Sequence, residues 1–264
     1  MSFRLGDIII DRMQIGVAED FDGNLLYTLT QLQEGTIDIT GESKEARDAN
    51  GTLVKKFWNA KSGTFTATNA MINTNIMAAT SGSAAEIATA ENPLDMPKII
   101  TVKVGTTTTL KNFVEGTVKV NAFYSNGTMG DAYALGAAAS ETEFSLTEEG
   151  TFTPPTVPEG SDIVQFVVKY QRKVEAGVAI KNKADKFPGT VKLTIKVLAV
   201  DPCSADTLKA GYVVLPSFQV SPEVSIGLQT DSTLEYKGDL QVQYCGTEKT
   251  LYEFYWADED EEDE

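Results

Sequence analysis

Short runs of alternating apolar and polar residues, separated by glycine, proline and asparagine turns, recur along the whole chain. The segment Leu25–Leu32 alternates in this way, and Ile37 and Ile39 follow with polar residues between them. A period of two places one face of an extended strand against a core and leaves the other face in water. About ten or more such runs predict an all-β fold, mainly β with packed sheets in a sandwich or barrel.

One segment departs from this pattern and has helical spacing. Between Asn69 and Ser81, apolar residues recur three and four positions apart, which is typical of a helix with one buried face. Thr68 or Asn69 is a suitable N-cap, and Gly82 is a suitable residue for the C-terminal end. We therefore expect one flanking α-helix, with Ala84–Ala90 as a second short helical piece.

We expect the chain to form a single β-sandwich domain over residues 1–257. Within it, residues of about 84–160 are predicted to form an insertion or long loop, because 126–160 are rich in Gly, Ala, Ser, Thr, Glu and Pro. The last segment, 258–264, is wholly acidic. It is predicted to be a solvated C-terminal tail, with docking onto basic residues of a partner as the alternative.

The charge balance limits the partners of the chain. It has 38 acidic and 22 basic residues, which give a net charge of −16. Affinity for phosphate comes from lysine and arginine, so this balance argues against tight binding to nucleic acid or to an anionic membrane. It is compatible with a surface past which nucleic acid slides without adhering, because like charges repel.

No targeting or membrane segment is expected. The opening MSFRLGDIIIDR has three consecutive isoleucines that are followed at once by charged residues, unlike a signal peptide. No stretch approaches the ~20 apolar residues of a membrane span. We therefore expect the protein to be made in a cytoplasm.

The residue types that most enzymes and metal sites use are scarce. Histidine is absent, and the cysteines are Cys203 and Cys245. This excludes histidine-based nucleophilic catalysis and histidine-ligated zinc, and two cysteines are too few for an all-cysteine zinc site. The two cysteines either form a disulfide or remain as buried free thiols. We expect no enzyme, no cofactor and no metal site.

Some local motifs have two interpretations. Asp20–Asn24 (DFDGN) resembles the start of a calcium loop, but Leu25 stands where an EF-hand needs glycine, so a surface turn is favoured. Asn50–Gly51–Thr52 and Asn126–Gly127–Thr128 match the glycosylation sequon and are equally good hairpin turns. Paired carboxylates could support glycoside hydrolysis, but such pairs are frequent by chance among 38 acidic residues.

Residues 35–82 contain an ordered series of motifs. The strand Gly35–Gly41 leads into the turn Asp48–Ala49–Asn50–Gly51, a DxxG-type hairpin, and two strands then precede the helical segment NAMINTNIMAATSG. This series resembles the opening module of bacteriophage tail tube (major tail) proteins. The portion from Val197 to Trp256 also resembles phage structural proteins. The middle, about 84–160, departs from the compact form of that family.

The resemblance implies a tail-tube-like fold with two packed sheets flanked by a helix. Six copies would form a ring whose inner strands join into one ring-wide β-barrel, and loops or arms would stack the rings into a conduit for DNA ejection. The implied partners are further copies of the chain, the tail sheath, the tape measure and the baseplate proteins. Viral DNA would pass without specific binding, and no membrane is implied. The protein would reside in the virion tail after synthesis in the host bacterial cytoplasm.

Predicted subunit-interface residues lie in turns or in aromatic pairs. They are Asp22, Asn24, Arg47, Asn50, Phe57, Trp58, Tyr255 and Trp256. The aromatic pairs would equally suit a carbohydrate platform. The alternative functions are therefore another phage structural protein, such as a head decoration, tail terminator or capsid-associated protein, or a carbohydrate-binding or surface β-sandwich module.

Overall fold

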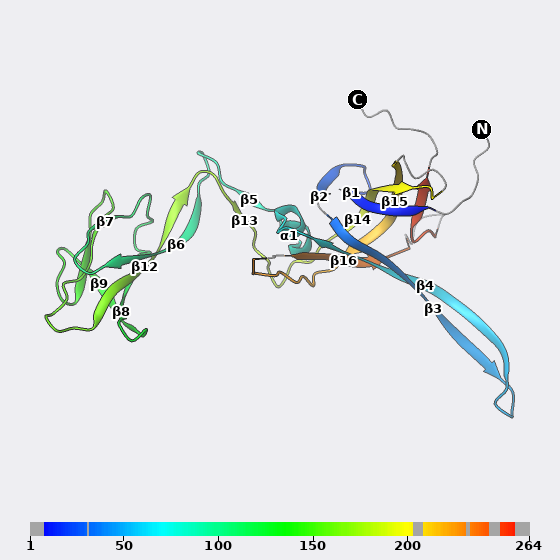
Figure 1. Ribbon diagram of the computed structural model, residues 1–264, viewed down its shortest axis with the longest axis horizontal. Helices are drawn as coiled ribbons and strands as arrows, with labels where there is room; N and C mark the ends of the chain where they lie inside the picture. The colour runs from blue at the N-terminus through cyan, green and yellow to red at the C-terminus, as the bar shows by residue number, and fades with distance from the viewer. Residues whose placement is uncertain (1–7, 31, 203–207, 231–232, 243–248, 257–264) are drawn as a thin grey trace. The chain divides into compact units, whose positions relative to one another are not determined.

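The computed structural model describes residues 8–30, 32–202, 208–230, 233–242 and 249–256. The chain divides into two compact units, Met1–Ala85 with Ile180–Glu264, and Glu86–Ala179. Regular structure in the described residues is almost entirely β-strand, with one helix, so the predicted all-β fold with a flanking helix is confirmed (Figure 1). The acidic tail and both cysteines, Cys203 and Cys245, lie outside the described residues.

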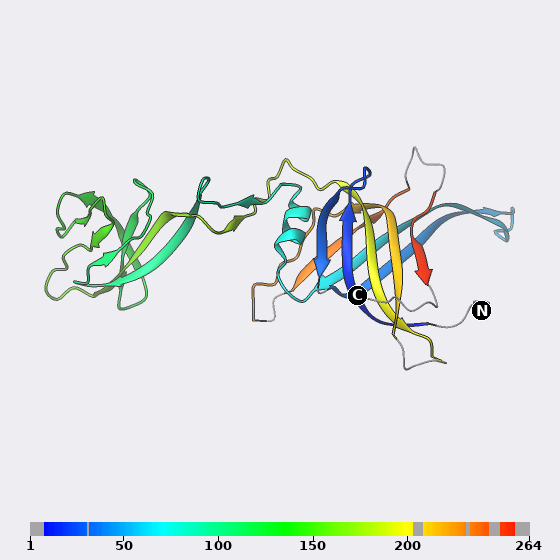
Figure 2. The ribbon, with the colours of Figure 1, turned by 90° about the horizontal axis from the view of Figure 1, so that it is seen from above.

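The first unit is built on one antiparallel sheet. Its elements are β1 (Ile9–Glu19), β2 (Leu25–Thr30), β3 (Leu32–Arg47), β4 (Leu53–Asn69), α1 (Thr74–Ser81), β14 (Thr190–Val200), β15 (Lys209–Val220), β16 (Leu234–Leu240) and β17 (Glu253–Trp256). The strands are hydrogen-bonded in the order β2–β1–β14–β15–β16–β4–β3, and β17 also pairs with β15. Figure 2 shows β1 and β2 in blue beside β14 and β15 in yellow.

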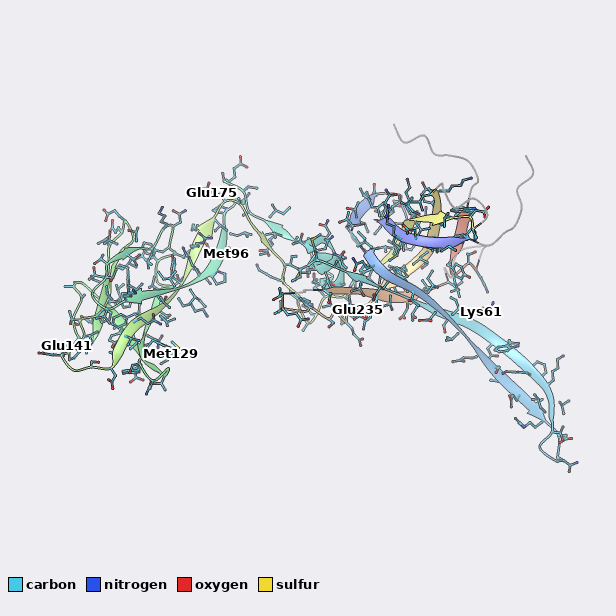
Figure 3. The ribbon with its side chains drawn as sticks, viewed as in Figure 1. Lys61, Met96, Met129, Glu141, Glu175 and Glu235 are labelled. Atoms are coloured by element: carbon cyan, nitrogen blue, oxygen red, sulfur yellow. The ribbon has the colours of Figure 1, made fainter. Side chains whose placement is uncertain are left out.

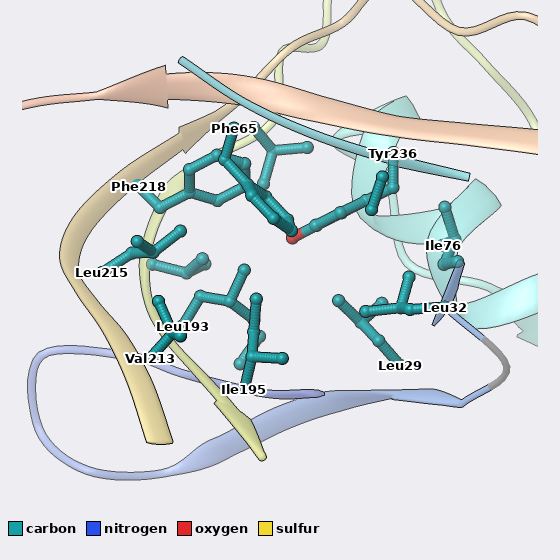
Figure 4. Close-up of a cluster of buried hydrophobic side chains, with 14 of the residues drawn as sticks. Leu29, Leu32, Phe65, Ile76, Leu193, Ile195, Val213, Leu215, Phe218 and Tyr236 are labelled. Atoms are coloured by element: carbon teal, nitrogen blue, oxygen red, sulfur yellow. The ribbon is translucent and has the colours of Figure 1, made fainter. Parts of the chain in front are cut away.

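The sheet curls into a nearly closed, barrel-like layer around a single core. Gly35 of β3 packs on Met13 of β1, because a Cβ on this glycine would lie 2.6 Å from the methionine sulfur. Strand β14 shows how the sequence places the core: Val191, Leu193 and Ile195 are buried and alternate with more exposed residues. Figure 4 shows Leu193 and Ile195 facing the aromatic residues of β4, β15 and β16.

Helix α1 is capped at both ends by residue types that the sequence predicts, but the helix begins later in the chain than predicted. The Asn73 side chain accepts hydrogen bonds from two backbone N–H groups of the first turn, at 2.8 and 3.4 Å. Gly82 ends the helix with a φ of 61°, in the left-handed region that favours glycine, as predicted. The N-cap predicted at Thr68 or Asn69 is wrong, because β4 stays paired with β16 as far as Asn69.

Strands β3 and β4 form a longer hairpin than the sequence predicts. The sequence predicts a strand break at Glu34–Gly35, but this pair forms a bulge within β3, where Glu34 has a φ of 51° and the register shifts before Thr36. The sequence also predicts a turn at Ala60–Ser62, but β4 continues through these residues: Lys61 and Ser62 pair with β3, and the register shifts at 59–60. The two strands therefore run together from the core of the unit to a distant turn at 48–52 (Figure 1).

The second unit has its own sheet and its own core. Its strands are β5 (Glu86–Ile87), β6 (Leu94–Lys103), β7 (Thr108–Thr109), β8 (Lys119–Tyr124), β9 (Met129–Gly136), β10 (Glu143–Leu146), β11 (Thr151–Thr153), β12 (Ile163–Val174) and β13 (Val178–Ala179). Seven of them follow the order β6–β12–β8–β9–β10–β11–β7, and β5 pairs with β13. The predicted helical piece at Ala84–Ala90 is wrong, since β5 lies there.

The segment 126–160 is more regular than the long loop that its composition predicts. It contains β9, β10 and β11, and the side chains of Phe144 and Phe152 are buried in the core of the second unit. Their rings lie 5.6 Å apart between centroids. These two aromatic residues, with Tyr133, Leu146 and Val157 packed against the same core, anchor the segment to the second unit.

A buried tyrosine pair joins β2 to β16 in the first unit, and its contribution to the free energy of unfolding can be measured. The hydroxyls of Tyr27 and Tyr236 lie 2.9 Å apart, and Tyr236 is fully buried. Burial raises the pKa of both phenols, and that of Tyr236 lies well above its ordinary value. Because the folded state holds these protons more tightly, the pair's contribution to stability is complete below pH ~10 and is lost as pH rises above it.

We expect Tyr27→Phe to lower the free energy of unfolding by about 1–2 kcal/mol, because it leaves the Tyr236 hydroxyl buried without its partner. Urea unfolding at pH 7 measures this change. Tyr27→Phe with Tyr236→Phe should cost less than the two single changes together, and should flatten the decline in stability above pH 10. Equal alkaline declines in the wild type and the double variant would contradict this account.

Candidate assembly surfaces

The most exposed part of the first unit is the outer half of the β3–β4 hairpin, residues 40–61, which we call the hairpin arm. None of its residues is buried, whereas alternate residues of β4 are buried from Gly63 onward. Lys61 marks this transition in Figure 3, and beyond it side chains extend from both faces of the two strands. The arm is a two-stranded ribbon without a core of its own.

Both faces of the arm carry the same sequence of side-chain types along β4. One face has Leu53, Lys55 and Phe57, and the other has Val54, Lys56 and Trp58, because successive residues of a strand point to opposite sides. On each face the lysine ammonium lies over the aromatic ring, at 5.2 Å from the Phe57 centroid and 4.6 Å from the Trp58 centroid. Trp58 is 66% exposed. Each face is thus an apolar and cationic contact surface.

The turn at the tip of the arm is held by Asp48. Its carboxylate accepts hydrogen bonds from the backbone N–H groups of Asn50 and Thr52, at 2.9 and 2.8 Å. These bonds hold the pKa of Asp48 below its ordinary value, and the bond from the Thr52 backbone N–H has the largest effect. Arg47 donates to the Gly51 carbonyl at 2.9 Å and to Glu45 at 2.6 Å. The tip is therefore an ordered feature, with the Asn50 side chain exposed.

A second turn of the same kind contains the predicted interface residues Asp22 and Asn24. Asp20 accepts from the backbone N–H groups of both residues, at 2.9 and 2.8 Å, and from the Asn24 side chain at 2.8 Å. The Asn24 side-chain bond is the main cause of the lowered pKa of Asp20. The carboxylate that a calcium loop would use first is thus engaged with the backbone of its own turn, as in a surface turn.

The last two predicted interface residues lie on β17. Tyr255 is exposed and donates its hydroxyl proton to Glu253 at 2.5 Å, whereas Trp256 is half-buried. The Trp256 ring packs against Gly211 of β15, where a Cβ would lie 3.1 Å from it. Trp256 therefore contributes to the fold as well as to any surface.

The structure places four of the eight predicted residues on one feature. Arg47, Asn50, Phe57 and Trp58 share the hairpin arm, whereas the pair at 22 and 24 and the pair at 255 and 256 lie in separate elements. The predicted interface residues do not include Leu53, Val54, Lys55 and Lys56, which lie on the same arm. The repeat of aliphatic, lysine and aromatic pairs in LVKKFW was the available signal, because two consecutive apolar residues on a strand cannot both face one core.

The described residues contain no candidate metal site. They contain no group of three or more Asp, Glu, Cys or His side chains placed to hold a metal ion. A cavity of about 550 Å³ in the second unit is lined by apolar side chains, including Phe113 and Tyr133, and by the carboxylates Glu115 and Glu148. In the part of the chain that the structure describes, the helix α1 is too short to cross a bilayer.

Comparison with known proteins adds an independent finding. The model of the YomU/Tube protein family matches residues 7–252, which include both compact units. The match therefore covers the hairpin arm and both turns, and it ends just before β17. No curated protein matches the chain.

Proposed function

Because the chain belongs to the YomU/Tube protein family, a phage tail tube family, we propose that it forms stacked rings of six copies that enclose the conduit for DNA ejection. Family membership makes it a structural protein of the phage tail. The ring, its six-fold symmetry and the conduit are our proposal. We assign ring formation to the first unit and treat the second unit, residues 86–179, as an insertion in the tube domain.

The hairpin arm is the observation that carries this proposal. An isolated two-stranded ribbon is marginally stable in water, and this one exposes an aliphatic side chain and an aromatic ring on each face. A second copy packed on each face would bury these side chains and stabilise the ribbon. Exposed apolar surface of this kind is typical of protein–protein contacts.

Charge complementarity favours another copy of the chain as that partner. The arm has five basic and three acidic residues, a net charge of +2, whereas the whole chain carries −16. The remainder of each copy therefore carries −18. A positive arm that meets the acidic body of a neighbour has the complementary potential that guides association and fixes orientation.

The edges of the sheet support the same proposal. Within the described residues, β2 pairs with β1 alone and β3 with β4 alone, so each end of the main sheet has one unpaired edge. Exposed edges invite pairing with another chain, and closing them around a ring removes this aggregation hazard. The turn with Asp22 and Asn24, next to β2, and the surface of β17 with Tyr255 and Trp256 are further proposed contacts between copies.

The remaining parts of the proposal concern the environment of the tube. An acidic lumen would let viral DNA pass without specific binding, because like charges repel. The tail sheath, the tape measure and the baseplate proteins are the proposed partners outside and inside the tube. We place the assembled protein in the virion tail, after synthesis in the host bacterial cytoplasm, and propose no catalytic role.

Negative-stain electron microscopy of the purified chain over a concentration series tests this function. We expect hollow tubes, or rings with six-fold symmetry and a central channel, to become more abundant as the concentration rises. A uniform population of monomers at the highest concentration would contradict self-assembly. Compact trimers without a channel would instead favour a head decoration or another capsid-associated role.

A further inference from the structure

The second unit has a sheet face on which lysine is concentrated. In β6, β12 and β8, the buried residues such as Val102, Phe166 and Val120 point to the core, so their neighbours point outward. Four exposed lysines stand on this outward face, which we call the lysine face: Lys103, Lys119, Lys169 and Lys173.

The strand register fixes how these lysines are spaced. Lys169 of β12 lies directly opposite Lys119 of β8, and Gln165, four residues earlier, lies opposite Lys103 of β6. Lys173 follows four residues later on β12. At ~3.3 Å per residue, the three levels of positive charge are about 13 Å apart and span about 26 Å along the strands.

This arrangement has an electrostatic cost where Lys169 lies opposite Lys119. Like charges directly opposite each other destabilise a sheet. None of the four lysines makes an ion pair with a carboxylate of the described residues, and Asp95, opposite Lys173, is the acidic residue in register with this face. Residues 86–179 nevertheless contain twelve acidic and seven basic side chains. Positive charge is therefore sorted onto one face of an acidic unit.

A short, extended polyanion would complement this face in charge and in length. The chain itself contains one, because Asp258–Glu264 is seven consecutive acidic residues. In extended form these residues span about 23 Å, which matches the three levels of the lysine face. A long external polyanion such as DNA would instead meet the net charge of −16 on every copy.

We infer that the lysine face binds the acidic run Asp258–Glu264 of a neighbouring copy. The neighbour follows from the proposed self-assembly, on which this inference rests, because assembly raises the effective concentration of each terminal run around its neighbours. The contact would link copies through the inserted unit, in addition to the hairpin arm. Since its charges are exposed, it should be sensitive to salt.

Zero-length cross-linking of assembled protein with a carbodiimide tests the inference, because this reagent joins a carboxylate directly to a lysine. Assemblies of mixed ¹⁴N and ¹⁵N chains identify by mass which cross-links join two copies. Lys111 is the matched control, since it is an exposed lysine of the second unit outside β6, β8 and β12. We expect cross-links from 258–264 to the lysine face to exceed those to Lys111 by about ten-fold or more at low salt.

Four results separate the outcomes. Loss of these cross-links at about 1 M salt, where the Debye length is about 3 Å, supports the inference, as does loss of the cross-links to Lys103 and Lys173 in Lys119→Gln with Lys169→Gln. Tubes that form without such cross-links would overturn it and leave the proposed function intact. Cross-links within one copy alone would also overturn it. Retention of a single-stranded DNA oligonucleotide that depends on Lys119 and Lys169 would make this face a nucleic-acid surface instead.

Discussion

Replacing Phe57 and Trp58 together by alanine is expected to abolish tube and ring formation while leaving the monomer folded. Both side chains are more than half exposed, and they lie on opposite faces of the hairpin arm, beyond the point at which β4 enters the core. Their removal therefore takes little from the monomer. In the proposed assembly, the two substitutions remove the aromatic side chain at the centre of the contact on each face of the arm.

The expected size follows from the behaviour of aromatic anchors. A buried tryptophan or similar hot-spot residue contributes about 2 kcal/mol or more to an interface, and each 1.4 kcal/mol changes an equilibrium constant ten-fold. Two such losses raise the concentration needed for assembly by about a thousand-fold. Sedimentation and electron microscopy over a concentration series measure this change.

A matched control separates the arm from exposed apolar surface in general. Phe187 and Leu228 also lie in the first unit and are 71% and 87% exposed, but they are outside the arm. The variant Phe187→Ala with Leu228→Ala should assemble like the wild type. If both double variants assemble normally, the arm does not hold the copies together. If the Phe57 and Trp58 variant loses its circular dichroism spectrum, the arm has a folding role that its exposure does not indicate.

The sequence predicted the class of fold because the strand pattern is local. In β14, residues from Val191 to Ala199 alternate between buried and more exposed positions, and every buried position is an apolar residue in the sequence. The end of α1 at Gly82 was equally local, since a left-handed residue after a helix favours glycine. Such signals need no knowledge of the partner strand.

The errors lie where distant pairing decides the structure. Asn69 has the chemistry of an N-cap, but β3 and β16 both pair with β4 up to this residue and keep it extended. The apolar alternation of residues 224–228 favours a strand, but they form an isolated bridge at Ile226, and the strand lies at Leu234–Leu240. Neither register can be read from the local pattern.

The candidate site was predicted in its residue types and missed in its extent. Phe57 and Trp58 were predicted as subunit-interface residues; the structure leaves both exposed on the arm, and their interface role stays a prediction. The length of the arm was not predicted, because the register shift after Gly41 lets β4 run past Ala60 without a turn. A bulge is a property of two strands together, so neither strand alone reveals it.

Gly238→Ala is expected to have the largest effect on folding, a loss of about 3 kcal/mol or more in the free energy of unfolding of the first unit. Gly238 lies in β16 between Val220 of β15 and Phe65 of β4. A Cβ at this position would lie 2.2 Å from the Gln219 carbonyl oxygen and 2.6 Å from Cζ of Phe218. The first of these atoms belongs to the backbone, so the strand itself would have to move.

The aromatic core explains why this space is occupied. The rings of Phe65 and Phe218 lie 5.9 Å apart edge to face, and Phe218 lies 5.6 Å from Tyr236. Glycine in the adjacent strand leaves room for these rings, which is a recognised reason for glycine inside a strand. A methyl group at Gly238 would therefore disturb the aromatic part of the core, where Figure 4 shows Phe65, Phe218 and Tyr236.

Gly189→Ala is the control, because the position adjoins no atom within 4 Å and has no positive φ. It should change stability little, or raise it by about 0.4–1 kcal/mol by restricting the unfolded chain. Both tryptophans, Trp58 and Trp256, belong to the first unit, so their fluorescence during urea unfolding reports that unit alone. If Gly238→Ala unfolds at the same urea concentration as Gly189→Ala, β15 and β16 are not packed at this point as described, because a side chain would then fit where the backbone of Gln219 now lies.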